Sequence, residues 1–202
     1  MYLKECLLCQ RQLQTNATWM TLFERFPQTI CERCQSSFEK VEEQQKDMYS
    51  LFYYNEAMQD YLHRYKFMHD TILAQVFRKE IYQTLKNETV MPIPMHPTKK
   101  SERTFSHIEL LLEEAQIPFV DILEKISEEA QGTKTREERM TTPQLFRIKQ
   151  QPTFKRCVIF DDIITTGKTI EHAKRLLYDV GVQHIRCVTL ITAKAKNVIS
   201  GM

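Results

Sequence analysis

Glycine is scarce in this chain, with only 4 among 202 residues. The scarcity bears on one stretch, Gly167-Lys168-Thr169, which could end a nucleoside-triphosphate P-loop. That motif needs another glycine five positions earlier, because its glycine-rich arc wraps the phosphates. The sequence has Asp162 at that position, so we expect no P-loop in this segment.

Long apolar runs are also missing. None reaches the length that spans a membrane, and the opening MYLKECLLCQ lacks the apolar core of a secretory signal. We therefore expect a protein that is made and kept in the cytoplasm. A net charge of +2 gives no global electrostatic argument for binding nucleic acid. With 42% hydrophobic and 27% charged residues, the composition is typical of a globular protein with one well-buried domain.

Four of the six cysteines lie near the N-terminus. Cys6 and Cys9 form one CxxC pair, and Cys31 and Cys34 form a second pair 21 residues later. Two such pairs supply the four thiolates of the tetrahedral site that Zn²⁺ prefers, and with four protein ligands the metal would be structural. Two disulfides or a redox pair are the alternatives, although a cytoplasmic location argues against disulfides.

The cysteine-containing segment also suggests how the chain is divided. About 40 residues have too small a core to fold unaided, so a bound metal would hold the segment together. We expect a zinc-ribbon-like module over residues 1–45 and a second domain over residues 46–202.

Residues 157–180 contain the pattern of a strand, a tight turn and a helix. Residues 157–160 are apolar and rich in β-branched side chains, which predicts a buried strand. From residue 170 onward, apolar residues recur at helical spacing until the chain reaches Gly181. The polar residues between them predict a loop that leads into the helix N-terminus: Thr165, Thr166, Gly167, Lys168 and Thr169.

Two carboxylates, Asp161 and Asp162, precede this loop. Free backbone N–H groups at a helix N-terminus, together with threonine hydroxyls, make a site for a monophosphate. Carboxylates accept hydrogen bonds from the hydroxyls of a sugar. The combination predicts a ribose 5-phosphate site, with the acids on the 2′ and 3′ hydroxyls and the loop on the phosphate. The alternative is an ordinary buried strand whose acids cap the next helix.

Strands and helices alternate along the rest of the chain. This order predicts an α/β fold, a parallel sheet wrapped by helices with the ligand outside the carboxyl ends of the strands. Residues 127–142 have no apolar period and predict a mobile loop. Tyr61 and Tyr65 lie on one helical stripe and predict core packing, with a stacking platform for single-stranded nucleic acid as the alternative. The expected strands are 51–54, 90–97 (with a proline-rich loop at its end), 119–123, 146–148 and 184–192, and the expected helices are 57–68, 72–85 and 108–115.

The segment VIFDDIITTGKTI, residues 158–170, resembles the phosphoribosyl pyrophosphate (PRPP) loop of type I phosphoribosyltransferases. The resemblance implies that both acids and the five loop residues bind PRPP. Displacement of pyrophosphate from PRPP needs cations over the leaving group and a shield from water. Mg²⁺ would bridge the phosphates and the ribose hydroxyls. The candidates for pyrophosphate contacts, for which a solvated surface is the alternative, are Lys99, Lys100 and Arg103, with Lys134 and Arg136 on the loop that could close over the site.

The two CxxC pairs and the stretches SLFYYNEAMQDYLHRYKF, IPMHP, KTREERM and VIFDDIITTGKTI together resemble the competence protein F (ComFC) family over most of the chain. The resemblance implies a four-cysteine zinc module on a type I phosphoribosyltransferase-like fold. It also implies a role in DNA uptake during natural transformation, with the ComFA helicase as partner and recruitment to the membrane uptake machinery. Where the family usually has Arg-Gly-Phe-Asn-Gln, residues 103–107 read Arg-Thr-Phe-Ser-His, which removes a flexible glycine and two amides.

Two functions stay open on the sequence alone. In the first, the chain is a binding module for DNA import that holds PRPP, a nucleotide or a strand-end phosphate, with single-stranded DNA as a further partner. In the second, it is an active phosphoribosyltransferase that transfers ribose 5-phosphate from PRPP to a base or an amine. The altered residues 103–107 and the lack of a convincing acceptor site favour binding, and no catalytic residue is assigned. A scaffold with a vestigial pocket is a third interpretation.

Overall fold

The structure is a computed structural model of the chain. It describes residues 4–13, 23–44, 46–98, 101, 104–126 and 145–193. Several predicted features lie outside these residues: the loop at 127–142, and the candidate cations Lys99, Lys100, Arg103, Lys134 and Arg136. Among the described residues, no helix is both long enough and apolar enough to cross a membrane.

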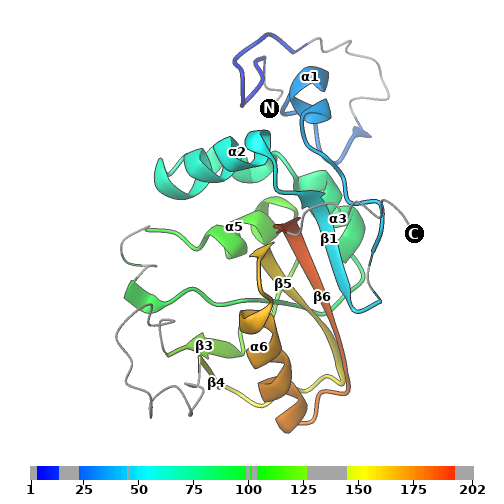
Figure 1. Ribbon diagram of the computed structural model, residues 1–202, viewed down its shortest axis with the longest axis vertical. Helices are drawn as coiled ribbons and strands as arrows, with labels where there is room; N and C mark the ends of the chain where they lie inside the picture. The colour runs from blue at the N-terminus through cyan, green and yellow to red at the C-terminus, as the bar shows by residue number, and fades with distance from the viewer. Residues whose placement is uncertain are drawn as a thin grey trace, which may run out of the picture.

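A four-stranded parallel sheet forms the centre of the molecule (Figure 1). The spatial order is β1-β6-β5-β2, and every neighbouring pair is parallel. This arrangement confirms the predicted α/β fold, in which parallel strands need crossover connections through helices. The strands are β1 (Met48–Tyr53), β2 (Val90–Pro92), β5 (Arg156–Ile164) and β6 (His184–Thr192).

The two longest strands, β5 and β6, lie side by side in the middle of the sheet. Both are almost continuously buried, as expected for strands covered on both faces. The prediction for β6 is confirmed in full, but β5 begins at Arg156 and continues to Ile164 rather than stopping at residue 160. Ile163 and Ile164 continue the apolar pattern beyond the two acids, so the strand does not end where the acids begin.

Helices cover both faces of the sheet, with α6 on one face and α3 and α5 on the other (Figure 1). The connection from β1 to β2, the two edge strands, contains α3, whereas the connection between the central strands β5 and β6 contains α6. The described helices are α1 (Glu32–Ser36), α2 (Glu56–Phe67), the 3₁₀ helix η2 (Thr71–Gln75), α3 (Arg78–Leu85), α5 (His107–Glu114) and α6 (Lys168–Asp179). The single helix expected over 72–85 is therefore two elements, η2 and α3.

Polar residues fix the start of two of these helices. The side chain of Asn55 accepts a hydrogen bond from the Met58 N–H at 3.0 Å and caps α2. Ser106 accepts from the Glu109 N–H and caps α5, directly before His107. The caps determine where along the chain each helix begins, and hence which residues of α2 and α5 face the sheet.

Two of the expected strands are not part of the parallel sheet. β3 (Leu123–Lys125) and β4 (Phe146–Ile148) pair with each other in a separate antiparallel sheet. Phe119, expected to start a strand, makes a single parallel bridge to Val90. The residue pattern correctly indicated extended backbone, but a period of two does not specify the partner of a short strand.

The N-terminal segment shares one hydrophobic core with the rest of the chain. Phe38, just after the second cysteine pair, packs edge-on against Phe77 with ring centroids 4.9 Å apart, and it also contacts Phe52 of β1. Tyr61 and Tyr65 of α2 are fully buried, which confirms the core interpretation of the aromatic stripe. The division at residue 45 stays a prediction, and apolar side chains of the two parts belong to one hydrophobic cluster.

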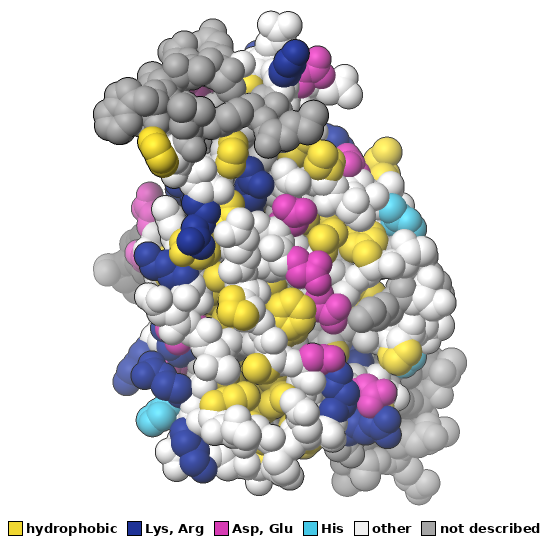
Figure 2. All heavy atoms as spheres, turned by 180° about the vertical axis from the view of Figure 1, so that it is seen from behind, with side chains coloured by type: hydrophobic (Ala, Val, Ile, Leu, Met, Phe, Trp, Pro, Cys, Tyr) yellow, Lys and Arg dark blue, Asp and Glu magenta, His cyan; other side chains and the backbone are white. Residues whose placement is uncertain are grey.

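Charges are unevenly distributed on the surface. Seen from behind, basic side chains gather along one margin of the molecule, while acidic side chains run down its middle (Figure 2). A net charge of +2 therefore conceals a local separation of sign. Such separation can orient an anionic partner even when the overall charge is small.

Candidate functional site

The four N-terminal cysteines converge on one point. Their Sγ atoms all lie within 4.8 Å of one another, and the Cys9 and Cys31 Sγ atoms are 3.7 Å apart. A tetrahedral site with Zn–S bonds of about 2.3 Å has sulfur–sulfur edges of about 3.8 Å. The donor set therefore fits a zinc ion, which would be held by Cys6, Cys9, Cys31 and Cys34 and would cross-link the two CxxC pairs.

Backbone amides support the thiolate form of Cys6. The Cys31 N–H donates to the Cys6 Sγ at 3.3 Å. Although burial of Cys6 opposes ionisation, hydrogen bonds from the N–H groups of Cys31, Cys9 and Leu8 lower the pKa of the thiol to about 7. Burial, and next the neighbouring thiols, raise the pKa of Cys34 instead. Metal ligands must be deprotonated, so binding of a metal ion would release the proton of Cys34.

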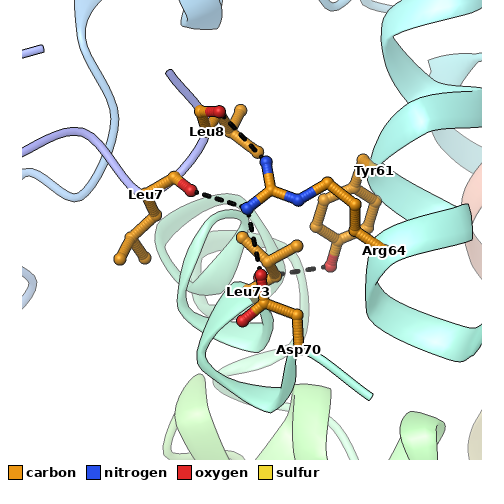
Figure 3. A network of polar contacts seen from close by, with 6 residues as sticks. All are labelled: Leu7, Leu8, Tyr61, Arg64, Asp70 and Leu73. Atoms are coloured by element: carbon orange, nitrogen blue, oxygen red, sulfur yellow. Dashed lines mark hydrogen bonds and ion pairs between the residues drawn. The ribbon is translucent and has the colours of Figure 1, made fainter. Parts of the chain in front are cut away.

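The carbonyl groups of Leu7 and Leu8, between the cysteines of the first CxxC pair, point toward Arg64 on α2 (Figure 3). The guanidinium donates to the Leu8 carbonyl at 3.0 Å and to the Leu7 carbonyl at 3.1 Å. It also pairs with Asp70 at 3.0 Å, just beyond the end of α2. One planar side chain thus connects the metal-binding turn to the helix that runs across the main domain.

The turn between β5 and α6 has the geometry of an anion site. Thr165 and Thr166 are exposed, and α6 begins at Lys168. Gly167 occupies the N-cap in the left-handed region, at φ +80°, where a residue with a Cβ atom is strained. The first N–H groups of α6 have no partner within the helix and are oriented along its axis toward the turn. The helix begins two residues earlier than predicted, and this places Thr169 in its first turn.

The structure separates the two adjacent acids. Both lie within β5, and successive side chains of a strand point to opposite faces of the sheet. Asp162 faces α2 and α5, because its carboxylate pairs with Lys66 of α2 and with His107 of α5. Asp161 lies on the opposite face, where its Oδ1 accepts the Asp162 N–H at 2.9 Å.

Asp162 is buried, with 4% of its surface exposed. Its Oδ2 makes an ion pair with the Lys66 ammonium and lies 3.1 Å from the His107 Nε2. Burial alone would raise the pKa of this carboxyl, but Lys66 and then His107 outweigh burial and hold the pKa well below its usual value. Asp162 is therefore a carboxylate whose charge is already balanced within the protein.

Asp161 has the opposite electrostatic character. Its own burial, and next the neighbouring Asp162 charge, raise the pKa of Asp161 to about 8. A protonated carboxyl can donate as well as accept a hydrogen bond, which suits a sugar hydroxyl. For a divalent cation the donor set is poor, since Asp162 faces an ammonium and Asp161 already accepts a backbone N–H. The residues at Asp162 do not fit Mg²⁺.

Residue 104 carries a strained backbone. Thr104 has φ +64°, in the left-handed region that β-branched residues rarely adopt. Thr104 lies at the position where the ComFC family, which the sequence resembles, usually has glycine. The backbone therefore keeps a conformation that favours glycine, although the residue is threonine. The strain lies three residues before His107, at the start of the segment that leads into α5.

Sequence reasoning missed Lys66 and His107 as parts of this site. The missing information is spatial: both residues lie far from Asp162 in the chain, and only the packing of α2 and α5 on the sheet brings them to it. One signal existed, because Lys66 directly follows the buried Tyr65 in the last turn of α2 and so lies beside the buried side of the helix. The predicted candidates Lys99, Lys100, Arg103, Lys134 and Arg136 lie outside the described residues.

Proteins of known family resemble this chain in sequence. Residues 71–198 match the phosphoribosyl transferase domain family. The chain is 31% identical over 93% of its length to competence protein ComFC of Streptococcus pneumoniae R6, of which it covers 99%. The chain belongs to the ComFC family. A second ComFC relative, from Bacillus subtilis 168, is 25% identical, over 87% of this chain and 89% of that protein.

One solved structure similar to this ComFC-family chain is that of a phosphoribosyltransferase. The adenine phosphoribosyltransferase of Leishmania tarentolae superposes with a TM-score of 0.43 at 10% identity, over 76% of this chain and 94% of that chain. The match to the domain family and the identity to the Streptococcus pneumoniae relative confirm the resemblance to the ComFC family stated from the sequence, and the phosphoribosyltransferase-like class of the fold.

Proposed function

We propose that this chain is a cytoplasmic factor of natural transformation that binds a phosphoribosyl ligand at the β5–α6 corner. The observation that carries the proposal is the exposed turn at Thr165 and Thr166, capped by Gly167 in a left-handed conformation and followed at once by the N-terminus of α6. Relatives named competence protein ComFC support the biological role.

The ligand would be recognised in two parts. Its 5′-phosphate would bind the N–H groups of the α6 N-terminus and the hydroxyls of Thr165, Thr166 and Thr169, with Lys168 beside them. The ribose hydroxyls would contact Asp161, which is half-buried and thus the less buried acid of the pair, while Asp162 would hold the strand end in place through Lys66. PRPP and a ribonucleotide carry both groups, whereas a DNA strand-end phosphate supplies the phosphate alone, because deoxyribose lacks the 2′ hydroxyl and its 3′ oxygen joins the next nucleotide.

Partners follow from the family. We propose that the chain works with the ComFA helicase and with single-stranded DNA, and that it is recruited to the membrane uptake machinery through them. The basic margin in Figure 2 supports an anionic partner on that side of the molecule. Lys99 and Lys100, beyond the described residues, stay candidates for contacts to phosphate, as do Arg103, Lys134 and Arg136.

A second candidate is an active phosphoribosyltransferase, favoured by the match of residues 71–198 to that domain family. Turnover requires an acceptor and stabilisation of the departing pyrophosphate. The strained Thr104, and His107 bound to Asp162, occupy the segment where the family usually has a glycine and two amides. These features support binding over turnover.

Titration calorimetry with ribose 5-phosphate and with PRPP tests the proposal. Thr166→Ala and Gly167→Val should each weaken binding at least about tenfold, equivalent to about 1.4 kcal/mol, because one removes a hydroxyl and the other distorts the cap. Thr153→Ala is the matched control, an exposed threonine at the opposite, amino end of β5. Equal binding by all four proteins, or none by the wild type, contradicts the proposal.

Activity and biological role need separate assays. Release of pyrophosphate from PRPP, measured with a panel of bases, should stay at background, and robust base-dependent release would establish the transferase instead. Transformation frequency in a strain carrying Gly167→Val should fall, whereas Thr153→Ala should leave it unchanged. Retention of single-stranded DNA should weaken as salt rises and when Lys99 and Lys100 are replaced.

A further inference from the structure

Asp162 sits at the centre of a buried cluster of charges. The side chains of Lys66, His107 and Asp162 are 13%, 10% and 5% exposed. Lys66 comes from the C-terminal end of α2 and His107 from the first residue of α5, so two helices bring positive or proton-donating groups to one carboxylate oxygen. The arrangement is built into the fold rather than formed by flexible surface side chains.

The charges of this cluster oppose the binding of a divalent cation at Asp162. Mg²⁺ prefers about six oxygen ligands in octahedral geometry and is usually held by one or two carboxylates together with the phosphates of a ligand. Here the Asp162 Oδ2 already faces an ammonium and an imidazole. A divalent ion beside Asp162 would be repelled by Lys66 at short range and in surroundings that screen charge poorly.

Asp161 does not provide a metal site in place of Asp162. Asp161 lies on the opposite face of β5, and its Oδ1 accepts the N–H of Asp162. The acids therefore cannot bind one metal ion from two sides, as adjacent carboxylates on a loop could. Any Mg²⁺ would depend mainly on oxygens that the ligand itself supplies.

We propose, on the basis of the proposed function, that this site binds sugar phosphomonoesters without a divalent cation, with Lys66 as the permanent counter-charge of Asp162. The ligand class is a ribose 5-phosphate group, free or as part of a ribonucleotide. Lys66 and His107 are positioning residues: they fix the acidic end of β5 beside the phosphate turn. A diphosphate ligand such as PRPP still brings Mg²⁺ with it, through its own phosphate oxygens.

The decisive experiment is calorimetry of the wild-type protein with ribose 5-phosphate in excess EDTA and in millimolar MgCl₂. The Kd should differ by less than about threefold between the two buffers. A larger weakening in EDTA overturns the inference. PRPP in the same two buffers is the positive control, because this ligand binds Mg²⁺ through its own phosphate oxygens.

The outcomes separate this inference from the proposed function. The inference is overturned if ribose 5-phosphate binds only with Mg²⁺, or if PRPP binds and ribose 5-phosphate does not. Either result leaves the proposed phosphoribosyl site in place. Binding of neither ligand overturns both. Equal binding of ribose 5-phosphate in the two buffers supports both.

Two variants test the role of Lys66 itself. Lys66→Met removes the charge at similar length, and its binding of ribose 5-phosphate should become at least about tenfold stronger with Mg²⁺ than with EDTA. Lys66→Arg keeps the charge and should stay independent of Mg²⁺. If Lys66→Met does not fold, as judged by circular dichroism, the Lys66→Arg and wild-type arms still decide, since Mg²⁺-dependence in either one contradicts the inference.

Discussion

Replacement of Lys66 by methionine tests the buried charge cluster through protein stability. The change keeps the length of the side chain but leaves the Asp162 carboxylate, 5% exposed, without its ammonium partner. Removing one member of a buried ion pair typically costs about 3–5 kcal/mol. We expect the low end, about 3 kcal/mol, because His107 keeps its contact to Asp162. That loss is a large share of the 5–15 kcal/mol typical of a whole domain.

Urea unfolding followed by circular dichroism measures this effect. With a slope of about 2 kcal/mol per molar urea, the midpoint should fall by about 1.5 M. Asp162→Asn should be similarly destabilising, since it leaves the Lys66 ammonium without its carboxylate partner. The double variant Lys66→Met/Asp162→Asn removes both charges. Its loss of unfolding free energy should therefore be smaller than the sum of the two single losses by about 2 kcal/mol or more.

An exposed ion pair supplies the control. Arg186 and Glu88 are 3.0 Å apart with 47% of the arginine side chain exposed, so Arg186→Gln should cost no more than about 1 kcal/mol. If Lys66→Met costs as little as Arg186→Gln, and the double-variant cycle shows no coupling, then Asp162 is not a buried partner of Lys66 and the reasoning about its charge is wrong.

Three further predictions concern other parts of the molecule. Arg64→Ala should destabilise the protein by about 2–3 kcal/mol and speed zinc release to a chromogenic chelator, because the CxxC carbonyls lose their charged donor; unchanged release would mean that the connection to α2 does not hold the cysteine turn. Thr104→Gly should raise stability by about 1 kcal/mol through relief of the left-handed strain, and a loss of stability in urea would contradict that assignment. Asp161 has a pKa raised to about 8, so it contributes stability that is complete below about pH 4 and is lost as the pH rises through about 8. Asp161→Asn removes this dependence, and its melting temperature relative to wild type should rise between about pH 5 and pH 9; a constant difference would show that the Asp161 pKa is ordinary.

Local patterns in the sequence were sufficient for much of this architecture. The period-two and apolar runs located the strands of the parallel sheet, although β1 begins at Met48 rather than at residue 51 and β2 ends at Pro92 rather than at residue 97. The two CxxC pairs predicted a cluster that the structure brings within metal-binding distance. The Thr-Thr-Gly turn followed from the break between two apolar periods. Each of these features depends on neighbours in the chain, which is why sequence reasoning reached them.

Features that depend on tertiary packing were not predicted. The prediction that Asp161 and Asp162 bind one sugar placed them together at the carboxyl end of the strand, just before the loop. In the structure β5 continues through both acids to Ile164 and turns them to opposite faces. The pairing of β3 with β4, and the arrival of Lys66 and His107 at Asp162, arise from contacts between distant segments. No periodicity or spacing encodes those contacts.

The account depends most directly on where a phosphoribosyl ligand binds. A crystal structure of the protein soaked with ribose 5-phosphate would locate it. We predict the phosphate within hydrogen-bond distance of the N–H groups at 165–169, with a ribose hydroxyl at Asp161 and the Lys66–Asp162 pair intact. An empty β5–α6 corner at saturating ligand, or a ligand bound elsewhere on the molecule, would contradict the central claim.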